Sequence, residues 1–554
     1  MMMKMSLFKN FNKAGIAACA VAVGIMSVPM TANASAMEHR TYTYIYDYWE
    51  DVQDCPNVYE VSAVYTSSEL GLDTRMSSPS GLYAKDNMVY ICDTGNNRIV
   101  VLEKDETGRL VVKDIYDSVK NAPGAASLSG PTDIAVSDEG NIFIADKGNN
   151  RILKLDSRLN YIMQFDLPND SAIPADTTFL PNKIVIDTAE RVYCIADGIN
   201  KGLLKYEPDG TFSGFVGANK ASYDWLDYLW KRFATQEQLD RMQQDVPTEY
   251  SNIYMDYEGF IYASAGSFEP EDLDAGKVDA VRRLNLLGND ILVRNSEIPV
   301  YGDLYWGSAG GYSGPSYFSD VTAFENDIFV CLDRNRGRLF GYDDQGRMVF
   351  AFGGNGNMDG YFRRPVGIEH IGYDLIVLDT TDCSLTYFVL SEFGQAIYDA
   401  IDQFDAGKYE ESGESWQKVL DIDGNYDLAY IGIGRSLLRQ EKYKEAMEYF
   451  EIKYDDDNWS KAFKEYRKEW VQSHLFLTVL VILLLFLIPL SIEKYRDMRV
   501  EIATSDVFRF PDPEDNMTRE EIREYHKKQR QEYKEREKAK KEAKRLAKLG
   551  SNRY

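Results

Sequence analysis

The side chains most often used for catalysis are sparse in this chain. It holds four histidines, His39, His370, His474 and His526, and they are far apart in the sequence. A zinc site built from several histidines and a Ser-His-Asp hydrolase both need histidine close to other functional groups. We therefore expect no catalytic residues, no metal site and no cofactor.

Aromatic side chains form two clusters whose chemistry suits binding. Residues 299–317 are rich in glycine and include Tyr301, Tyr305, Trp306 and Tyr312. Residues 218–246 include Trp225 and Tyr228. Such rings can stack on a sugar or a peptide. The alternative is that they pack on neighbouring strands, and the sequence leaves both interpretations open for these six candidate binding residues.

An internal repeat predicts the elements that position these clusters. Ile91–Ile99, read as ICDTGNNRI, closely matches Ile144–Ile152, read as IADKGNNRI, and four looser copies follow. Each copy begins at a Gly- or Pro-containing turn and continues with apolar residues at strand spacing. The copies recur at roughly the length of a four-stranded blade, which predicts a radial array of six small sheets.

The shared polar residues of the repeat are candidates for a structural role. A carboxylate at a strand end, followed by Asn and Arg, is well placed to tie a turn to the next strand through hydrogen bonds. These residues are Asp93, Asn97, Arg98, Asp146, Asn150, Arg151, Asp197, Asp333 and Asp379.

These motifs resemble the NHL-repeat family of six-bladed β-propellers. The resemblance covers about residues 58–392, and it implies a mainly β fold with a face for binding. Residues 58–65 are expected to supply the strand that closes the ring with the last blade. Propellers similar to the gluconolactonases hold a divalent cation with carboxylate oxygens, but Ser78–Gly81 lacks the acidic residue that this family would place near the axis.

After residue 392 the apolar spacing changes from that of strands to that of helices. Gly407-Lys408-Tyr409 recurs as Glu441-Lys442-Tyr443 at an offset of 34 residues. This spacing resembles TPR repeats, and we assign a TPR-like helical pair to residues 393–470. Fewer than three such repeats are rarely stable alone, so the pair is expected to lean on the propeller, the membrane-proximal helix or another protein.

Two further segments predict export and membrane anchoring. Residues 1–36 combine three lysines, an apolar run and small residues, as in a signal peptide cleaved after Ala36 or Ala34, and 37–57 are a lead-in. Residues 475–492 carry no charge and are long enough to cross a bilayer. Basic residues follow at once, so the propeller is expected outside and the charged, helical tail at 493–554 inside.

The charge distribution narrows the partners. The chain has a formal net charge of −26, residues 1–36 carry +3 and residues 493–554 carry +4, which leaves −33 for residues 37–492. Nucleic-acid binding needs a basic surface and is therefore excluded.

The expected function is binding rather than catalysis. We expect a single-pass surface protein, of Gram-positive bacterial type, whose propeller and TPR-like helices contact protein partners and whose ligand is a carbohydrate or a peptide. Similar membrane-anchored NHL proteins look like accessories to ABC-type carbohydrate uptake systems. The alternative is a metal-dependent lactonase- or lyase-like propeller enzyme.

Overall fold

A computed structural model describes residues 43–174, 176–217, 249–266, 268–296, 298–307, 312–504, 514 and 516–550. The chain divides into two compact units, Met1–Asp456 and Asp457–Tyr554. The predicted signal peptide, with both cleavage sites, lies outside the described residues.

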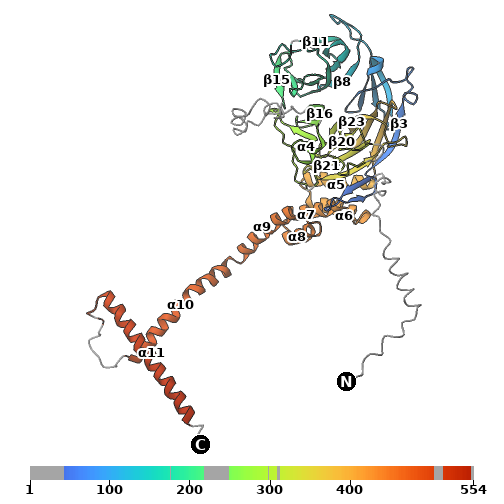
Figure 1. Cartoon of the computed structure of the whole chain (residues 1–554). Helices are drawn as coiled ribbons and strands as arrows, with labels where there is room; N and C mark the ends of the chain where they lie inside the picture. The colour runs from blue at the N-terminus through green and yellow to red at the C-terminus, as the bar shows by residue number, and fades with distance from the viewer. Residues whose placement is uncertain are drawn as a thin grey trace, which may run out of the picture. The chain divides into compact units, whose positions relative to one another are not determined.

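The first unit contains six antiparallel sheets, which we number as blades in chain order (Figure 1). Blade 1 is β4 (Gly81–Lys85), β5 (Met88–Asp93), β6 (Arg98–Lys104) and β7 (Leu110–Tyr116). Blade 2 is β8 (Pro131–Val136), β9 (Ile142–Asp146), β10 (Arg151–Leu155) and β11 (Tyr161–Phe165). Blade 3 is β12 (Pro181–Ile186), β13 (Val192–Ala196), β14 (Leu203–Tyr206) and β15 (Phe212–Val216).

Blade 4 has three strands among the described residues, β16 (Tyr250–Met255), β17 (Ile261–Ala265) and β18 (Val281–Leu284), with a short helix α4 (Pro270–Asp274) between the last two. Blade 5 contains β19 (Phe318–Ala323), β20 (Phe329–Asp333), β21 (Arg338–Tyr342) and β22 (Met348–Gly353). Blade 6 contains β23 (Pro365–Ile371), β24 (Asp374–Asp379) and β25 (Ser384–Leu390).

The six blades close into a ring. The first strand of each blade contacts the first strand of the next, in the order β4, β8, β12, β16, β19, β23 and back to β4. Blade 6 takes its outer strand from the start of the chain, because β3 (Tyr59–Thr66) pairs antiparallel with β25, with Tyr65 opposite Leu385. The predicted six-bladed propeller and its closing strand are thus confirmed.

The lead-in holds structure that its sequence did not reveal. Strands β1 (Thr43–Tyr46) and β2 (Val52–Asp54) form a hairpin, and β1 pairs with β22 on the outer edge of blade 5. This extends blade 5 to six strands and covers an edge that would otherwise be open to pairing with another chain.

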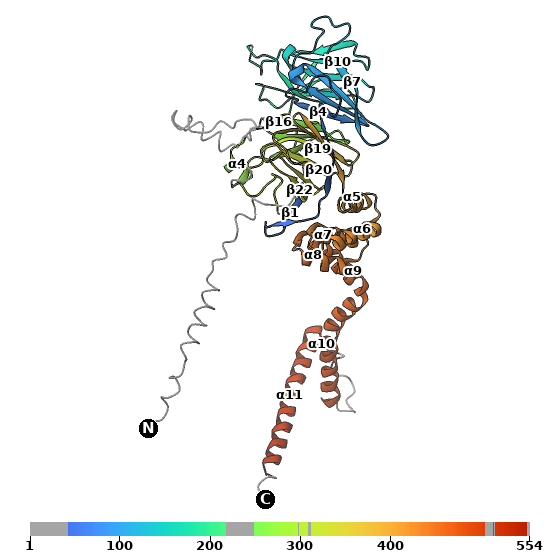
Figure 2. The same cartoon turned by 90° about the vertical axis from the view of Figure 1, so that its right-hand side faces the viewer.

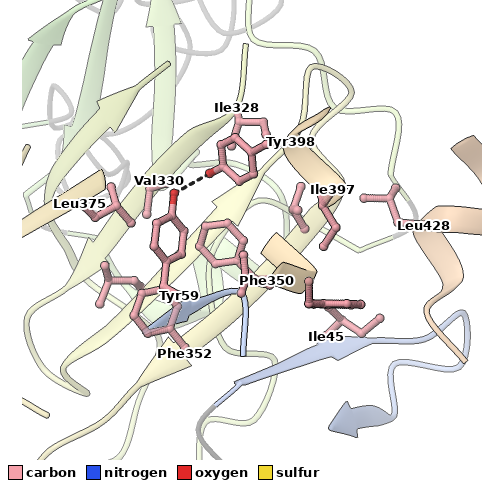
Figure 3. Close-up of a cluster of buried hydrophobic side chains, with 14 of the residues drawn as sticks. Ile45, Tyr59, Ile328, Val330, Phe350, Phe352, Leu375, Ile397, Tyr398 and Leu428 are labelled. Atoms are coloured by element: carbon pink, nitrogen blue, oxygen red, sulfur yellow. Dashed lines mark hydrogen bonds between the residues drawn. The ribbon is translucent and has the colours of Figure 1, made fainter. Parts of the chain in front are cut away.

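Four helices follow the last blade: α5 (Glu392–Asp405), α6 (Tyr409–Ile422), α7 (Asp427–Arg439) and α8 (Tyr443–Ile452). They share one apolar core with blades 5 and 6 (Figure 3). In it the fully buried Tyr59 hydroxyl lies 2.8 Å from that of Tyr398, and the Tyr426 hydroxyl donates to the Val349 carbonyl at 2.7 Å. The helices therefore lean on the propeller, while their TPR-like identity stays a prediction.

The second unit is helical. Helix α9 (Asp456–Ser473) starts at the unit boundary and is followed by α10 (Leu475–Thr504) and α11 (Arg519–Gly550). In α10 the segment Leu475–Ile502 is long and apolar enough to cross a membrane. Thr518 and Glu521 form a capping box at the start of α11. Helices α10 and α11 contact each other (Figure 2), and Arg530 of α11 pairs with Glu493 of α10 at 3.3 Å.

Candidate functional site

The repeated aspartates of blades 1 and 2 tie three segments of chain together. The buried Asp93 carboxylate accepts hydrogen bonds from Arg98 Nε at 2.7 Å, Asn96 Nδ2 at 2.8 Å and the Ser77 backbone N–H at 2.7 Å. Asp146 has the corresponding partners Arg151, Asn149 and Ser129, at 2.9, 2.8 and 2.8 Å. The structure thus places these aspartates at strand ends within the blades, joined to a turn, a strand and a preceding loop.

The other repeat residues lie in turns or at strand ends. Asn97 and Asn150 end short 3-10 turns, η2 (Thr94–Asn96) and η3 (Lys147–Asn149), at φ of 55° and 57°, a left-handed conformation that Asn tolerates. Asp197 pairs with Lys147 at 2.5 Å across two blades. Asp333 and Asp379 accept backbone N–H groups, among them those of Asn335 and Arg363.

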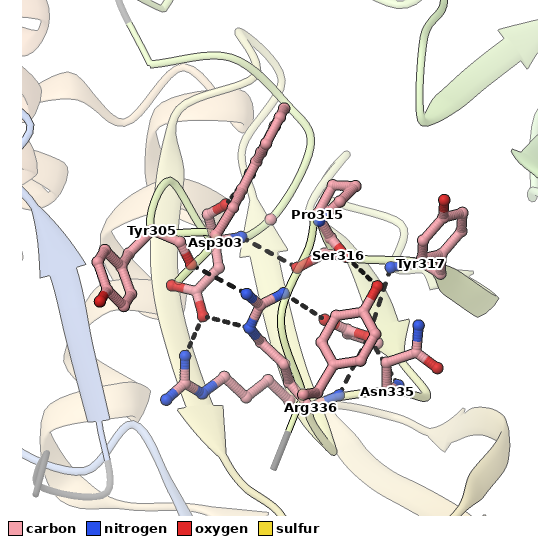
Figure 4. A network of polar contacts seen from close by, with 12 residues as sticks. Asp303, Tyr305, Pro315, Ser316, Tyr317, Asn335 and Arg336 are labelled. Atoms are coloured by element: carbon pink, nitrogen blue, oxygen red, sulfur yellow. Dashed lines mark hydrogen bonds and ion pairs between the residues drawn. The ribbon is translucent and has the colours of Figure 1, made fainter. Parts of the chain in front are cut away.

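The glycine-rich aromatic loop is built around a buried carboxylate, Asp303 (Figure 4). Asp303 accepts hydrogen bonds from the hydroxyls of Tyr46, at 2.6 Å, and Tyr44, at 3.2 Å, and it pairs with Arg338 and Arg336. The loop is thereby fastened to the N-terminal hairpin and to blade 5.

The candidate aromatic residues of this loop mostly face neighbouring protein groups. Trp306 donates its indole N–H to the Asp303 carbonyl at 3.0 Å and contacts the Tyr301 ring, and the Tyr312 hydroxyl donates to the Pro315 carbonyl. Tyr305 is 40% exposed. Trp225 and Tyr228 lie outside the described residues.

A second cluster of polar side chains lies at the propeller axis, and it was not predicted from the sequence. In blades 2 to 6 the first strand carries an irregularity in its pairing at the same place, as between Pro131 and Asp133 or between Phe318 and Asp320. An irregularity of this kind, a β-bulge, changes the direction in which the next side chain points. The residues at the position after this irregularity, and at its equivalent in blade 1, are Gly81, Asp133, Lys183, Asn252, Asp320 and Gly367.

These axial side chains join one blade to the next. Asp133 of blade 2 accepts the backbone N–H of Ile184 in blade 3 at 2.9 Å, and Asp320 of blade 5 accepts that of Ile368 in blade 6 at 2.8 Å. Asn252 of blade 4 donates to Asp320. Asp133, Asn252 and Asp320 therefore each take part in a hydrogen bond between blades near the centre of the ring.

The side chains two positions after the axial residues, on the same strands, form a second layer. Members of this layer line a cavity of about 330 Å³. Polar members of this layer are Tyr83, Tyr254 and Glu369, and the apolar members include Ala135 and Val185. The cavity extends from the axial ring to the turns between the first and second strands of blades 2, 3 and 4. Its volume is in the range of sites for small ligands.

Burial dominates the electrostatics of this site. It raises the pKa of Asp320 to about 7 and raises the pKa of Glu369 well above its ordinary value, with Asp320 and Asp133 adding to the effect on Glu369. Burial alone would lower the pKa of Lys183, but the carboxylates around it, with Asp133 at 3.9 Å, hold that pKa above its usual range. Burial thus favours the protonated form of Asp320 and Glu369, and the surrounding carboxylates favour the charged form of Lys183.

The described residues contain no group of three or more His, Cys, Asp or Glu side chains arranged to hold a metal ion. His370 lies on the same strand as Glu369, with Nδ1 2.7 Å from the Thr322 hydroxyl, and burial lowers its pKa to about 4. The chemistry available at the axis is therefore that of carboxyls, an amine, an amide and phenols.

The axial residues carry a signal that an alignment of the repeats would have exposed. In blades 2 to 6 they stand two residues after the Pro or aromatic residue that begins the first strand, as in Pro131-Thr132-Asp133 and Pro181-Asn182-Lys183. In the first copy this position is Gly81, where a Cβ would overlap the backbone of Thr132.

Comparisons with known proteins agree with the repeat and extend over part of the chain. Residues 128–155, in blade 2, match the family described as NHL repeat. A probable peptidyl-alpha-hydroxyglycine alpha-amidating lyase of Caenorhabditis elegans, pgal-1, is 26% identical over 136 residues, which are 22% of this chain and 38% of that protein. The chain thus spans well under half the length of this relative.

Two solved structures are similar at low identity. Virginiamycin B lyase of Staphylococcus aureus is 12% identical, with a TM-score of 0.35 over 60% of this chain and all of that one. A protein of unknown function from Bacteroides thetaiotaomicron is 10% identical, with a TM-score of 0.35 over 58% and 71% of the two chains. TM-scores of this size do not establish a common fold, so the assignment rests on the strand pairing and the matched repeat: the chain is a six-bladed β-propeller with an NHL repeat in its second blade.

Proposed function

We propose that this protein is a membrane-anchored binding protein whose propeller holds a small ligand in the axial cavity. The observation that supports it is a set of buried polar side chains, Asp133, Lys183, Asn252, Asp320 and Glu369, around one cavity. Buried titratable groups are costly to fold and gather at functional sites. The apolar segment of α10 supports the anchor.

Filling the cavity tests this proposal. Ala135 is buried and lines the cavity, so Ala135→Leu introduces three carbon atoms where a ligand would lie. We would screen amines, sugars and short peptides by thermal shift on full-length protein in mild detergent. We expect every cavity ligand to lose at least tenfold in affinity in Ala135→Leu and to keep its affinity in the exposed Glu60→Gln variant. Unchanged affinity in Ala135→Leu for every ligand found would refute an axial site.

A lyase is the second candidate, and two observations favour it. One is the partial similarity to the amidating lyase, and the other is the Asp320 carboxyl, whose pKa of about 7 suits a general base at neutral pH. In such a reaction Asp320 would take the proton of the α-hydroxyl, the C–N bond would break, and the nitrogen would gain a proton, giving a peptide amide and an aldehyde.

Incubation with a peptide ending in α-hydroxyglycine tests this second candidate. Formation of the peptide amide by the wild type, and its loss in Asp320→Asn, would support a lyase. Equal rates with wild type and without protein would remove the candidate. Because the described residues form no metal-binding group, we derive no step through a metal.

A protein partner is a further proposal, and its specific form, an ABC-type carbohydrate uptake system, has support only from resemblance. Affinity purification of full-length protein from its native membrane, followed by mass spectrometry, tests it. Recovery of transporter permeases would support the association, and recovery of the protein alone would refute a stable complex.

A further inference from the structure

Glu369 is a buried carboxyl group that lines the axial cavity from β23. It is 6% exposed, and it accepts a hydrogen bond from the backbone N–H of His370 but none from a side chain in the part of the chain that the structure describes. A carboxylate has two oxygens and can accept several hydrogen bonds. The Glu369 carboxyl group therefore keeps acceptor positions for a ligand in the cavity.

The groups around Glu369 favour a cation as that ligand. Tyr83 of β4 and Tyr254 of β16 line the same cavity, and burial, with the negative charge of Glu369 adding to it, raises the pKa of both hydroxyls. Both tyrosines have already donated their hydroxyl protons, to the carbonyls of Val136 and Ala323 at 3.1 and 3.3 Å. Their rings line the cavity, and aromatic faces attract cations.

The charges of the axial residues also favour a cation as the ligand. Asp133 of β8 and Asp320 of β19 also act on Glu369, and Lys183 of β12 is the opposing charge. Lys183 lies 3.9 Å from Asp133. His370, the neighbour of Glu369 on β23, contacts Thr322. Three carboxyl groups thus share one lysine, which leaves room for a second positive charge.

We propose that the axial cavity binds the ammonium group of an organic amine, held by the Glu369 carboxylate between the rings of Tyr83 and Tyr254. This inference rests on the proposed binding function and names its ligand class. An ammonium group fits better than a bare metal ion, because the described carboxyl groups do not converge as metal ligands. An ammonium ion also supplies several N–H donors to the oxygens of the Glu369 carboxylate.

Binding of an amine is coupled to proton release. Burial favours the protonated form of Glu369 in the empty site, and it raises the pKa of Asp320 to about 7. An incoming ammonium favours the ionised carboxylate, so Glu369 gives up its proton to solvent as the amine binds. The affinity therefore rises with pH, by up to tenfold per unit, as long as Glu369 is protonated in the empty protein and the amine stays charged.

Isothermal titration calorimetry of full-length protein in mild detergent tests this inference, with n-butylammonium as the probe and 1-butanol as its uncharged analogue. We would titrate at pH 6, 7 and 8 in buffers of different ionisation enthalpy, which counts the protons released. We expect binding of butylammonium to tighten with pH, with close to one proton released, and 1-butanol to bind at least tenfold more weakly.

The matched variants are Glu369→Gln, which keeps the shape and the neutral state of the side chain, and Glu60→Gln, which alters an exposed glutamate on β3. At pH 8 we expect Glu369→Gln to lose at least tenfold in affinity for butylammonium and all of its pH dependence, and Glu60→Gln to behave as the wild type. The thermal unfolding midpoint of each variant confirms that it folds.

Three results would overturn the inference: butanol and butylammonium binding alike, an affinity for butylammonium that ignores pH, or no effect of Glu369→Gln. Absence of butylammonium binding would overturn it as well. The proposed binding function stands apart from these outcomes, because it fails only when Ala135→Leu leaves every ligand of the wider screen unaffected.

Discussion

Replacing Glu369 by glutamine should stabilise the protein, and the gain should grow with pH. In the folded state burial raises the pKa of Glu369 well above its ordinary value, whereas in the unfolded chain the pKa is about 4.3. Between these two values the folded state holds a proton that the unfolded state lacks. The wild type therefore loses stability as pH rises through this window. Glutamine at position 369 does not titrate, so the Glu369→Gln variant has no such loss from this residue.

The magnitude follows from proton linkage. A difference of one bound proton changes the free energy of unfolding by about 1.4 kcal/mol per pH unit. For a cooperative unit of about 400 residues, with an unfolding entropy of about 2 cal/mol/K per residue, this is about 1.7 °C in the unfolding midpoint per pH unit. The midpoint of Glu369→Gln should thus move upward, relative to the wild type, by about 1.7 °C for each pH unit between about pH 4.3 and the raised pKa of the folded state.

Thermal unfolding of both full-length proteins, followed by tyrosine and tryptophan fluorescence at several pH values, measures this difference. His370, whose pKa burial lowers to about 4, has the opposite pH dependence, since its stability contribution is lost as pH falls. It is present in both proteins and cancels in the difference. Parallel midpoint curves for wild type and variant would refute a buried, protonated Glu369.

Three further substitutions test the packing. Asp146→Ala should cost about 3 kcal/mol, because it leaves a buried arginine without its partner, and a cost below about 1 kcal/mol would contradict the repeat geometry. Tyr426→Phe should cost about 1 kcal/mol through loss of its hydrogen bond to Val349, measured by denaturant unfolding. Gly432→Leu overlaps the Trp416 ring and should cost about 1–3 kcal/mol, with proteolysis within α6 and α7 as the readout; unchanged proteolysis would show that the helices pack otherwise.

The fold was predictable because its local signals agree with one another. The matched pair of repeats fixes the strand–turn–strand unit, since Asp93 and Asp146 each bond to residues a few positions away in the same copy. The N-terminal hairpin was not predictable in this way. Tyr44 and Tyr46 find their partner, Asp303, some 257–259 residues later, and no periodic pattern in the sequence records such a contact.

The residues of the candidate site were not predictable from the sequence either. Tyr301, Trp306 and Tyr312 have the residue types of a stacking site, but backbone carbonyls accept the Trp306 N–H and the Tyr312 hydroxyl. Arg336 lies over the Tyr312 ring, and the Tyr301 ring contacts Trp306. The axial residues differ in type from blade to blade, so a search for a shared residue passes over them. Their common property is a position at a pairing irregularity, and only the closed ring brings that position from six blades to one point.

The helices and the mouth of the cavity lie on the same face of the propeller. Asp402 of α5 accepts hydrogen bonds from Asn326 and Tyr373, which stand in the turns between the first and second strands of blades 5 and 6. The corresponding turns of blades 2, 3 and 4, which include Asp138 and Glu258, line the cavity. A protein held by α5 would therefore border the opening through which a ligand enters. Because coupling between two binding sites is reciprocal, a partner that tightens ligand binding must itself bind more tightly when the ligand is present, and co-purification with and without butylammonium would reveal such coupling.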